Sequence, residues 1–442
     1  MKVTKFLLIG LISIGIQSVK AQEKKGLTLN EAINIAISKS STIALASAKA
    51  DTKNYEYKMM KNNLYPDLRA SGQFFQLSNA NISSNLNSNS SNSSSPIAVN
   101  QVMLGQISAG LPLFAGFKLE NNVKASANLY SSEKAKLEQT KENIVMEIIE
   151  NYANLYRAQK AVILITDNLK SAEQRVTDFI SLEKNGIIAR NDLLKVQLQQ
   201  SKVQLALDEA YKNVSVYNYD LITLLKLPAD FKIDIDENQF GNKQPINTMN
   251  DVQVALKNRK DLEAIHFLQK ASENNIKIAK SAYYPSLNLT GGLIYLDLKN
   301  TLTVSNAMNF GVGLSYDFAN ILKNGTNVKT AKSKALEVQE SENILSEKIK
   351  TQVHEANENY NLALKQNLVY EQAIDQAKEN YRIVKDKYDN GLSNTTELLE
   401  ADVEQLNSKI NYAYSRANVM LKYYEMQFAA GQLIQSFQLT KN

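Results

Sequence analysis

The stretch YDNGLSNTTELLE, residues 388–400, decides how the chain folds because it interrupts two long helical patterns. Asn390 and Gly391 are typical of a helix C-terminus, since glycine readily adopts the left-handed backbone that ends many helices. Residues 393–396, Ser-Asn-Thr-Thr, then offer side-chain oxygens that can cap the start of a new helix. The stretch therefore predicts a tight tip between two antiparallel helices.

The same arrangement occurs once more, earlier in the chain. In both copies an aromatic residue precedes a glycine, and an acid six residues after that glycine is followed by Leu-Leu. The two sets are Phe179, Gly186, Asp192-Leu193-Leu194 and Tyr388, Gly391, Glu397-Leu398-Leu399. Other pairs recur at a similar spacing, with Tyr65-Pro66 matching Tyr284-Pro285 at an offset of 219 and Asn122-Val123 matching Asn327-Val328 at 205. These matches predict an internal duplication of about 200 residues.

Each copy contains a segment in which apolar and polar residues alternate, which is the pattern of a β-hairpin. The first spans about 66–114, around a loop at 78–95 made almost entirely of Ser and Asn, and the second spans about 285–319. Such strands alone are typical of a half-buried soluble sheet. Here they are few and flanked by long helices, so no soluble core could cover them. We predict four amphipathic strands, each about ten residues long.

Long helical patterns fill the rest of the chain. No glycine or proline interrupts residues 118–185, and some 60 residues in a helix would span roughly 90 Å. Residues 27–64 are amphipathic, with Thr28 and Glu31 at capping-box spacing. In the last helical stretch, apolar residues recur at alternating steps of four and three, the seam of a coiled coil: Leu399, Val403, Leu406, Ile410, Ala413, Ala417, Met420 and Tyr424.

Composition excludes several classes of function. The chain has no cysteine, so disulfides, thiolate metal sites and cysteine nucleophiles are absent. Its two histidines, His266 and His354, lie in helical patterns without a second imidazole at ligand spacing. The formal charge of +5 falls to +2 without the leader residues Lys2, Lys5 and Lys20, which is too little to indicate a nucleic-acid partner. We therefore expect no metal and no cofactor.

The chain divides into segments by these patterns. Residues 1–21 have the basic start, apolar core and small-residue cleavage site of a secretory signal. We predict a first repeat at 22–228, a connector at 229–247, a second repeat at 248–435 and a C-terminal tail at 436–442. After the signal, no stretch approaches 18 consecutive apolar residues, the length that indicates a transmembrane helix.

Four exported strands without a soluble core fit a membrane barrel. Sheet edges cannot face lipid, so the strands must close into a ring. Single-chain barrels begin at roughly eight strands, so four strands require several chains. A trimer would supply twelve strands, with the long helices extending away from the membrane.

The order of these parts resembles the TolC family of outer membrane efflux proteins. The resemblance rests on the duplicated helix–hairpin–helix–tip–helix unit, the Tyr-Pro before each first strand and the Gly-x5-[Asp/Glu]-Leu-Leu tips, and covers about residues 27–435. It implies a mainly α-helical homotrimer in the outer membrane lipid, with a shared 12-stranded β-barrel and a helical barrel in the periplasm. It also implies an exit duct, not an enzyme, which passes small molecules or polypeptides from an inner-membrane pump through a periplasmic adaptor, in tripartite efflux or type I secretion.

The resemblance also assigns roles at the tips. Glu397 and Glu400 match two acids that ring the closed mouth and favour cations, while Tyr388 matches an aromatic residue that contacts the first-tip acid, here Asp192. A family arginine is replaced here by Ser393, and Arg190 of the first tip could substitute for it. Glu397 has a simpler interpretation as a first-turn acid favoured by the helix dipole, and the two roles are compatible.

Two other classes are compared with this interpretation. A periplasmic adaptor would have one long helical hairpin between β-rich domains and no duplicated unit. A carboxylate-pair hydrolase would need two acids flanking a substrate site, whereas the prominent acids here lie on coiled-coil surfaces. The duplication and the two short hairpins favour the export duct.

Overall fold

The computed structural model describes residues 25–82, 97–240 and 251–437. The predicted signal at 1–21 lies outside the described residues, as do most of the Ser/Asn-rich loop and the ends of the connector and of the tail. The described chain is mainly helical, as predicted, and its helices are α1 (Leu29–Lys39), α2 (Ser41–Asn62), α3 (Lys118–Lys184), α4 (Arg190–Leu224), α5 (Val252–Asn258), α6 (Lys260–Ser281), α7 (Ala319–Asp389), α8 (Thr395–Ala429) and α9 (Leu433–Ser436). Its strands are β1 (Lys25–Leu27), β2 (Asp67–Ile82), β3 (Ile97–Ala115), β4 (Ile233–Ile235), β5 (Ser286–Leu298) and β6 (Leu302–Ser315).

The element order repeats, as the residue matches predicted. Two helices, a β-hairpin and two long helices follow one another in α1–α2–β2–β3–α3–α4 and again in α5–α6–β5–β6–α7–α8. The chain forms two compact units: unit 1 contains Met1–Ser40, Glu147–Pro245 and Ala363–Leu421, and unit 2 contains Ser41–Met146, Ile246–Leu362 and Lys422–Asn442. Each repeat contributes to both units, so the units do not correspond to the repeats.

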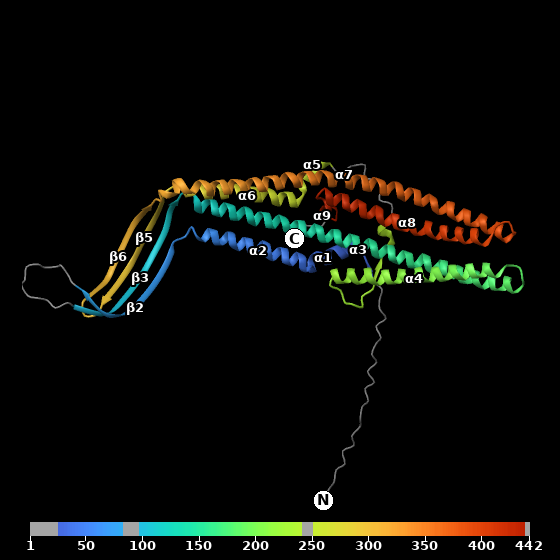
Figure 1. Ribbon diagram of the computed structural model, residues 1–442, viewed down its shortest axis with the longest axis horizontal. Coiled ribbons are helices and arrows are strands. Elements are labelled where there is room, and N and C mark those ends of the chain that lie inside the picture. Colours follow the sequence, from blue (N-terminus) through green and yellow to red (C-terminus); the bar gives the residue numbers. More distant parts are fainter. Residues whose placement is uncertain (1–24, 83–96, 241–250, 438–442) are drawn as a thin grey trace, which may run out of the picture. The chain divides into compact units, whose positions relative to one another are not determined.

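Unit 2 contains an antiparallel sheet of four strands in the order β2-β3-β5-β6, which Figure 1 shows side by side. Directly paired residues share one face, and one such row contains Ala70, Ile107, Leu293 and Met308. On this apolar face the side chains are open: Phe310 is 93% exposed and Met308 80%. The opposite face of β6 has small residues such as Asn309 and Gly311, which confirms the predicted alternation.

The strands are longer than the predicted ten residues. They contain 16, 19, 13 and 14 residues in β2, β3, β5 and β6. In the first hairpin the pairing continues past the apolar band, where the side chain of Gln101 donates a hydrogen bond to Gln76 at 3.0 Å. Polar pairs of this kind do not alternate in hydrophobicity, so the sequence pattern underestimated the strand length.

The helices enter and leave the sheet through tight junctions. Gly116, after β3, has a φ of +61°, and a Cβ at this position would lie 2.5 Å from the carbonyl oxygen of Ser281. The next residue, Phe117, contacts the ring of Tyr284 edge-on at 6.4 Å. The β3–α3 junction therefore packs closely against the α6–β5 junction.

In unit 1, α3, α4 and α8 share an apolar core. The buried residues Ile165 and Leu169 of α3 and Leu207 of α4 pack with Leu406 and Ile410 of α8. The last two belong to the predicted coiled-coil seam. The described part of the connector adds to this unit, because Phe240 stacks on Tyr156 with ring centroids 3.7 Å apart.

A buried acid in unit 2 lies beside a charged cluster. Glu142 of α3 is only 5% exposed. Burial raises the pKa of its carboxyl from 4.5 to about 7, against the charges of Arg259 and Lys260, which lower it. Arg259 is itself paired with Asp261 at 2.6 Å and donates to Gln352 at 2.9 Å. The guanidinium of Arg259 is thus engaged with its own partners, and burial has the larger effect on the Glu142 carboxyl. With a pKa of about 7, this carboxyl is half-protonated near neutral pH.

We predict that Glu142 makes stability fall with rising pH. Between pH 4.5 and about 7 the folded chain keeps a proton that the unfolded chain has lost, so raising the pH through this range favours unfolding by at most about 3 kcal/mol. Melting temperatures of purified protein, followed by circular dichroism across this range, should show the decline. Glu142→Gln should flatten it, whereas Glu147→Gln, at an exposed position on the same helix, should not. An equal slope in wild type and Glu142→Gln would contradict the assignment.

Candidate functional site

Both predicted tips are present in unit 1, and both end a helix in the same way. Gly186 and Gly391 have φ angles of +69° and +73°. Ile187 N–H donates to Leu182 O at 3.0 Å, and Leu392 N–H donates to Lys387 O at 2.8 Å. These bonds are those of the Schellman motif, in which a left-handed residue lets the chain satisfy the last carbonyls of a helix. The glycines therefore have the structural role that the sequence predicted.

The second tip also fixes the start of the next helix. Asn394, immediately before α8, accepts from the Glu397 N–H at 3.0 Å, and its side-chain amide donates to Oε1 of Glu397 at 2.7 Å. The hydroxyl of Ser393 donates to Oε2 of the same carboxylate at 2.5 Å. Asn394 therefore caps α8 by accepting from the Glu397 N–H. The Glu397 carboxylate is held at the start of the helix by hydrogen bonds from the side chains of Ser393 and Asn394.

Glu400 has a different environment, although it is only one turn further along α8. Its side chain is exposed and faces a groove between α4 and α8. The groove is lined by Lys195, Leu198, Gln199, Lys202, Thr396, Leu399, Glu400, Val403 and Glu404. No ion pair ties Glu400 within the described ranges. Of the two predicted pore acids, Glu400 is the one whose carboxylate stays available.

Aromatic stacking joins the two hairpins near their tips. The rings of Phe179 and Tyr388 stack with centroids 5.8 Å apart and planes 11° from parallel. They belong to a cluster whose buried core includes Leu193 and Val196. The ring of Tyr388 thus contacts the first hairpin, and the contact of Tyr388 with Asp192 stays a prediction. Asp192 lies 3.3 Å from Nζ of Lys195.

Arg190 pairs within its own hairpin. Its guanidinium lies 3.6 Å from Oε1 of Glu183, across the first tip, and its side chain is largely exposed. An exposed pair at this distance adds little stability. The idea that Arg190 replaces the missing family arginine at the second tip therefore stays a prediction.

A buried ion pair that the sequence reasoning missed joins the hairpins further from the tips. Arg175 of α3 holds Asp402 of α8 through two contacts of 3.0 Å, with side chains 10% and 4% exposed. Arg175 also donates to the hydroxyl of Tyr381 on α7 at 3.2 Å. One signal was available in the sequence, because Asp402 lies three residues after Leu399 and four before Leu406, on the apolar seam itself.

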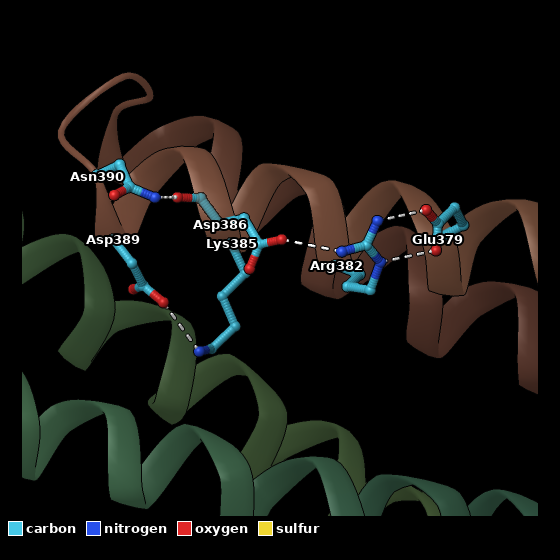
Figure 2. A network of polar contacts seen from close by, with 6 residues as sticks. All are labelled: Glu379, Arg382, Lys385, Asp386, Asp389 and Asn390. Carbon is cyan, nitrogen blue, oxygen red and sulfur yellow. Dashed lines mark hydrogen bonds and ion pairs between the residues drawn. The ribbon is translucent and has the colours of Figure 1, made fainter.

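The polar network at the end of α7 is exposed to solvent, in contrast to the buried pair of Arg175 and Asp402. Figure 2 shows Arg382 between Glu379, at 2.7 Å, and Asp386, at 2.9 Å, with Lys385 pairing with Asp389 at 3.1 Å. The side chains of these pairs are largely exposed, and the paired residues are three or four positions apart on one helix. The network keeps this face of α7 solvated and adds little to stability.

The described residues contain no candidate metal centre. Among residues 25–82, 97–240 and 251–437, no three His, Asp or Glu side chains gather closely enough to hold a metal ion. His266 lies on the surface, with Nε2 3.0 Å from Oε1 of Glu342.

No helix in these same ranges is both long and apolar enough to cross a membrane.

A comparison with protein families gives one match. The family described as "Outer membrane efflux protein" matches residues 32–225 and 252–432. A search of the curated proteins finds no match.

Several solved structures share the fold. VceC, an outer membrane protein of Vibrio cholerae, is 16% identical, with 91% of this chain and 96% of that chain covered and a TM-score of 0.76. The CmeC outer membrane channel of Campylobacter jejuni is 17% identical, with 92% and 86% covered and a TM-score of 0.77. The MtrE outer membrane channel of Neisseria gonorrhoeae, in its open state, is 18% identical, with 92% and 89% covered and a TM-score of 0.72.

We predict that Asp402→Ala is strongly destabilising, because it leaves the Arg175 guanidinium buried without its partner. The loss should be about 3–5 kcal/mol in the free energy of unfolding. A fall in the melting temperature of the purified protein in detergent measures it. Asp386→Ala, which removes an exposed partner of Arg382 (Figure 2), should leave the melting temperature near that of wild type.

The double variant Arg175→Met with Asp402→Leu completes this test. It removes both charges together and should recover most of the lost stability. If Asp402→Ala melted like wild type, the pair would have no role in holding α3 to α8.

Proposed function

Because the chain belongs to the outer membrane efflux protein family, we propose that three copies assemble into an exit duct whose twelve strands close one β-barrel. The protein is an outer membrane channel of efflux systems, with its helical part in the periplasm, and it is not an enzyme. The trimer, the partners of the duct and the roles of the tip residues are the proposed parts. We also propose that residues 22–228 and 248–435 form the two repeats.

The sheet of unit 2 is the observation that carries the proposal. Among the described residues, its outer strands, β2 and β6, each pair on one side only, and its apolar face is open. In lipid, unpaired N–H and C=O groups at an edge cost several kcal/mol each, so an edge must find another strand. Pairing of β6 of one copy with β2 of the next would satisfy both edges and direct the apolar face outward.

The tips are the proposed mouth of the duct. We assign the larger electrostatic role to Glu400, since its carboxylate is exposed, and a mainly structural role to Glu397, whose carboxylate accepts hydrogen bonds from Ser393 and Asn394. In a trimer these positions would place six acids near a narrow opening and attract cations. The contact of Tyr388 with Asp192, and the substitution by Arg190, would form between or within copies when the mouth closes.

An inner-membrane pump would supply the cargo through a periplasmic adaptor. The groove between α4 and α8 is amphipathic, with apolar residues such as Leu198 and Leu399 between lysines and glutamates. Such a surface suits helix packing, which supports an adaptor at the tips. The cargo would be small molecules in efflux or polypeptides in type I secretion. An adaptor without its own channel is the less favoured alternative, because it would have no use for an exposed apolar sheet.

Assembly is tested by mass. Purified full-length protein in mild detergent should have about three times the mass of one chain, because three copies of a four-stranded sheet are needed for twelve strands. Light scattering corrected for bound detergent, or native mass spectrometry, measures it. A stable monomer or dimer that still conducts ions in a bilayer would overturn the trimeric barrel.

The mouth is tested by conductance in planar bilayers. Glu400→Gln should weaken block by a trivalent cation about tenfold and change the conductance, because a ring of carboxylates concentrates cations at the opening. Glu397→Gln should act more weakly, since Ser393 and Asn394 already hold that carboxylate. Glu209→Gln, an exposed site on α4, is the control. Unchanged conductance and block in the variant with both substitutions would remove these acids from the pore.

A further inference from the structure

The four junctions between the sheet and the helices lie at one end of the sheet. The register pairs Asp67, at the start of β2, with Gly110, near the end of β3. It also pairs Ser286, at the start of β5, with Ala115 and with Ser315, at the end of β6. Four helix termini therefore meet the sheet at the same end of its strands, all within unit 2: the end of α2, the start of α3, the end of α6 and the start of α7. Figure 1 shows these four helices joining the strands there.

These junctions have an excess of lysine. Residues 56–66, 116–124, 275–285 and 316–325 contain seven lysines against three acids. We call the seven the lysine collar: Lys58, Lys61, Lys118, Lys124, Lys277, Lys280 and Lys323. All seven are exposed.

Acidic side chains of the same chain neutralise little of the positive charge of the lysine collar. In the part of the chain that the structure describes, none of the seven lysines forms an ion pair. Two of the three acids are engaged otherwise, because Glu56 pairs with Lys53 at 2.7 Å and Asp317 accepts from the N–H of Ala319 at 3.0 Å. Like charges gathered without partners repel one another, so the collar is suited to an anionic surface outside the protein.

The opposite end of the sheet has almost no charge. The sequence contains no charged residue between Arg69 and Lys118, and the second hairpin has only Asp297 and Lys299. The positive charge therefore belongs to one end of the sheet and is not a general property of its surface.

Exposed aromatic side chains also lie at this end of the sheet, as is typical of a membrane interface. Tyr65, Phe117, Tyr284 and Phe318 are exposed beside the junctions. Lys58 and Lys61 lie over the rings of Tyr55 and Tyr57, with Nζ 5.3 and 5.2 Å from the ring centroids. Tyrosine and lysine at the edge of an apolar surface are typical of the headgroup region, where aromatic rings and long cationic side chains meet both lipid and water.

We propose that the lysine collar binds the anionic headgroups of phospholipids in the leaflet at the helical end of the sheet. The inference rests on the proposed function, because it needs the sheet to span the bilayer. Each collar lysine lies within about seven residues of a junction, so it is within roughly 10 Å of the sheet along its helix. That distance is comparable to the headgroup layer and to the screening length in physiological salt. The collar would fix the depth of the sheet and would select anionic over zwitterionic lipids.

Native mass spectrometry of the purified full-length protein in detergent tests this, with phosphatidylglycerol and phosphatidylcholine as the added probes. Wild type should bind phosphatidylglycerol at least about tenfold more tightly, and added salt should reduce the preference. Lys118→Gln, Lys124→Gln, Lys277→Gln and Lys280→Gln together should bring the preference close to one. The same four positions changed to Arg should keep it, because the charge is retained.

A matched control changes the same number of exposed lysines on the helices of unit 1: Lys170→Gln, Lys212→Gln, Lys365→Gln and Lys378→Gln. This variant should keep the wild-type preference. Equal binding of both lipids by wild type, or an equal loss in the collar and control variants, would overturn the collar. Displacement of the lipid by an equal concentration of free glycerol phosphate would identify a soluble-anion site and also overturn it.

The failure of this inference can be told apart from failure of the proposed function. A conducting trimer without lipid preference would refute the collar alone. A protein that neither trimerises nor conducts would refute the duct, and with it the membrane placement on which the collar depends.

Discussion

An antiparallel sheet with an exposed apolar face and two incompletely paired edges is the constraint on which the rest of the molecule depends. In the part of the chain that the structure describes, β2 and β6 each pair with a neighbouring strand on one side only. The duplicated sequence provides two hairpins, so in the proposed barrel the edge N–H and C=O groups would be paired by other copies of the chain. The proposed oligomer thus follows from the hydrogen-bonding needs of the backbone.

Duplication supplied two copies of one design, which then diverged at the tips. Both copies keep the left-handed glycine, because the helix before it must end within one turn. The starts of the following helices differ, since Ala189 provides no side-chain cap for α4, whereas Asn394 caps α8 and its side-chain amide also bonds to the Glu397 carboxylate. The start of α8 is thus held by local bonds, and the start of α4 depends more on packing around Leu193.

Features encoded locally could be predicted from the sequence, and features that depend on distant partners could not. The two tips follow from a glycine and its neighbours, and the hairpins follow from alternation, as at Phe310. The length of β2 and β3 was underestimated because polar pairs such as Gln76 and Gln101 have no periodic signal. The partner of Arg175 lies 227 residues away, so only the fold reveals it.

The buried pair also limits how the tips can move. Separating α3 from α8 would leave Arg175 and Asp402 without each other in a site from which water is nearly excluded, at a cost of several kcal/mol. Exposed contacts such as Arg382 with Asp386 exchange with water at little cost. If the tips form the proposed mouth, a change in its width would cost least when α3 and α8 stay together and the end of α7, where Tyr388 stacks on Phe179, adjusts around them. The buried pair of Arg175 and Asp402, further from the tips, already holds the two hairpins of one chain together. An arginine in place of Ser393 is therefore not needed for this contact.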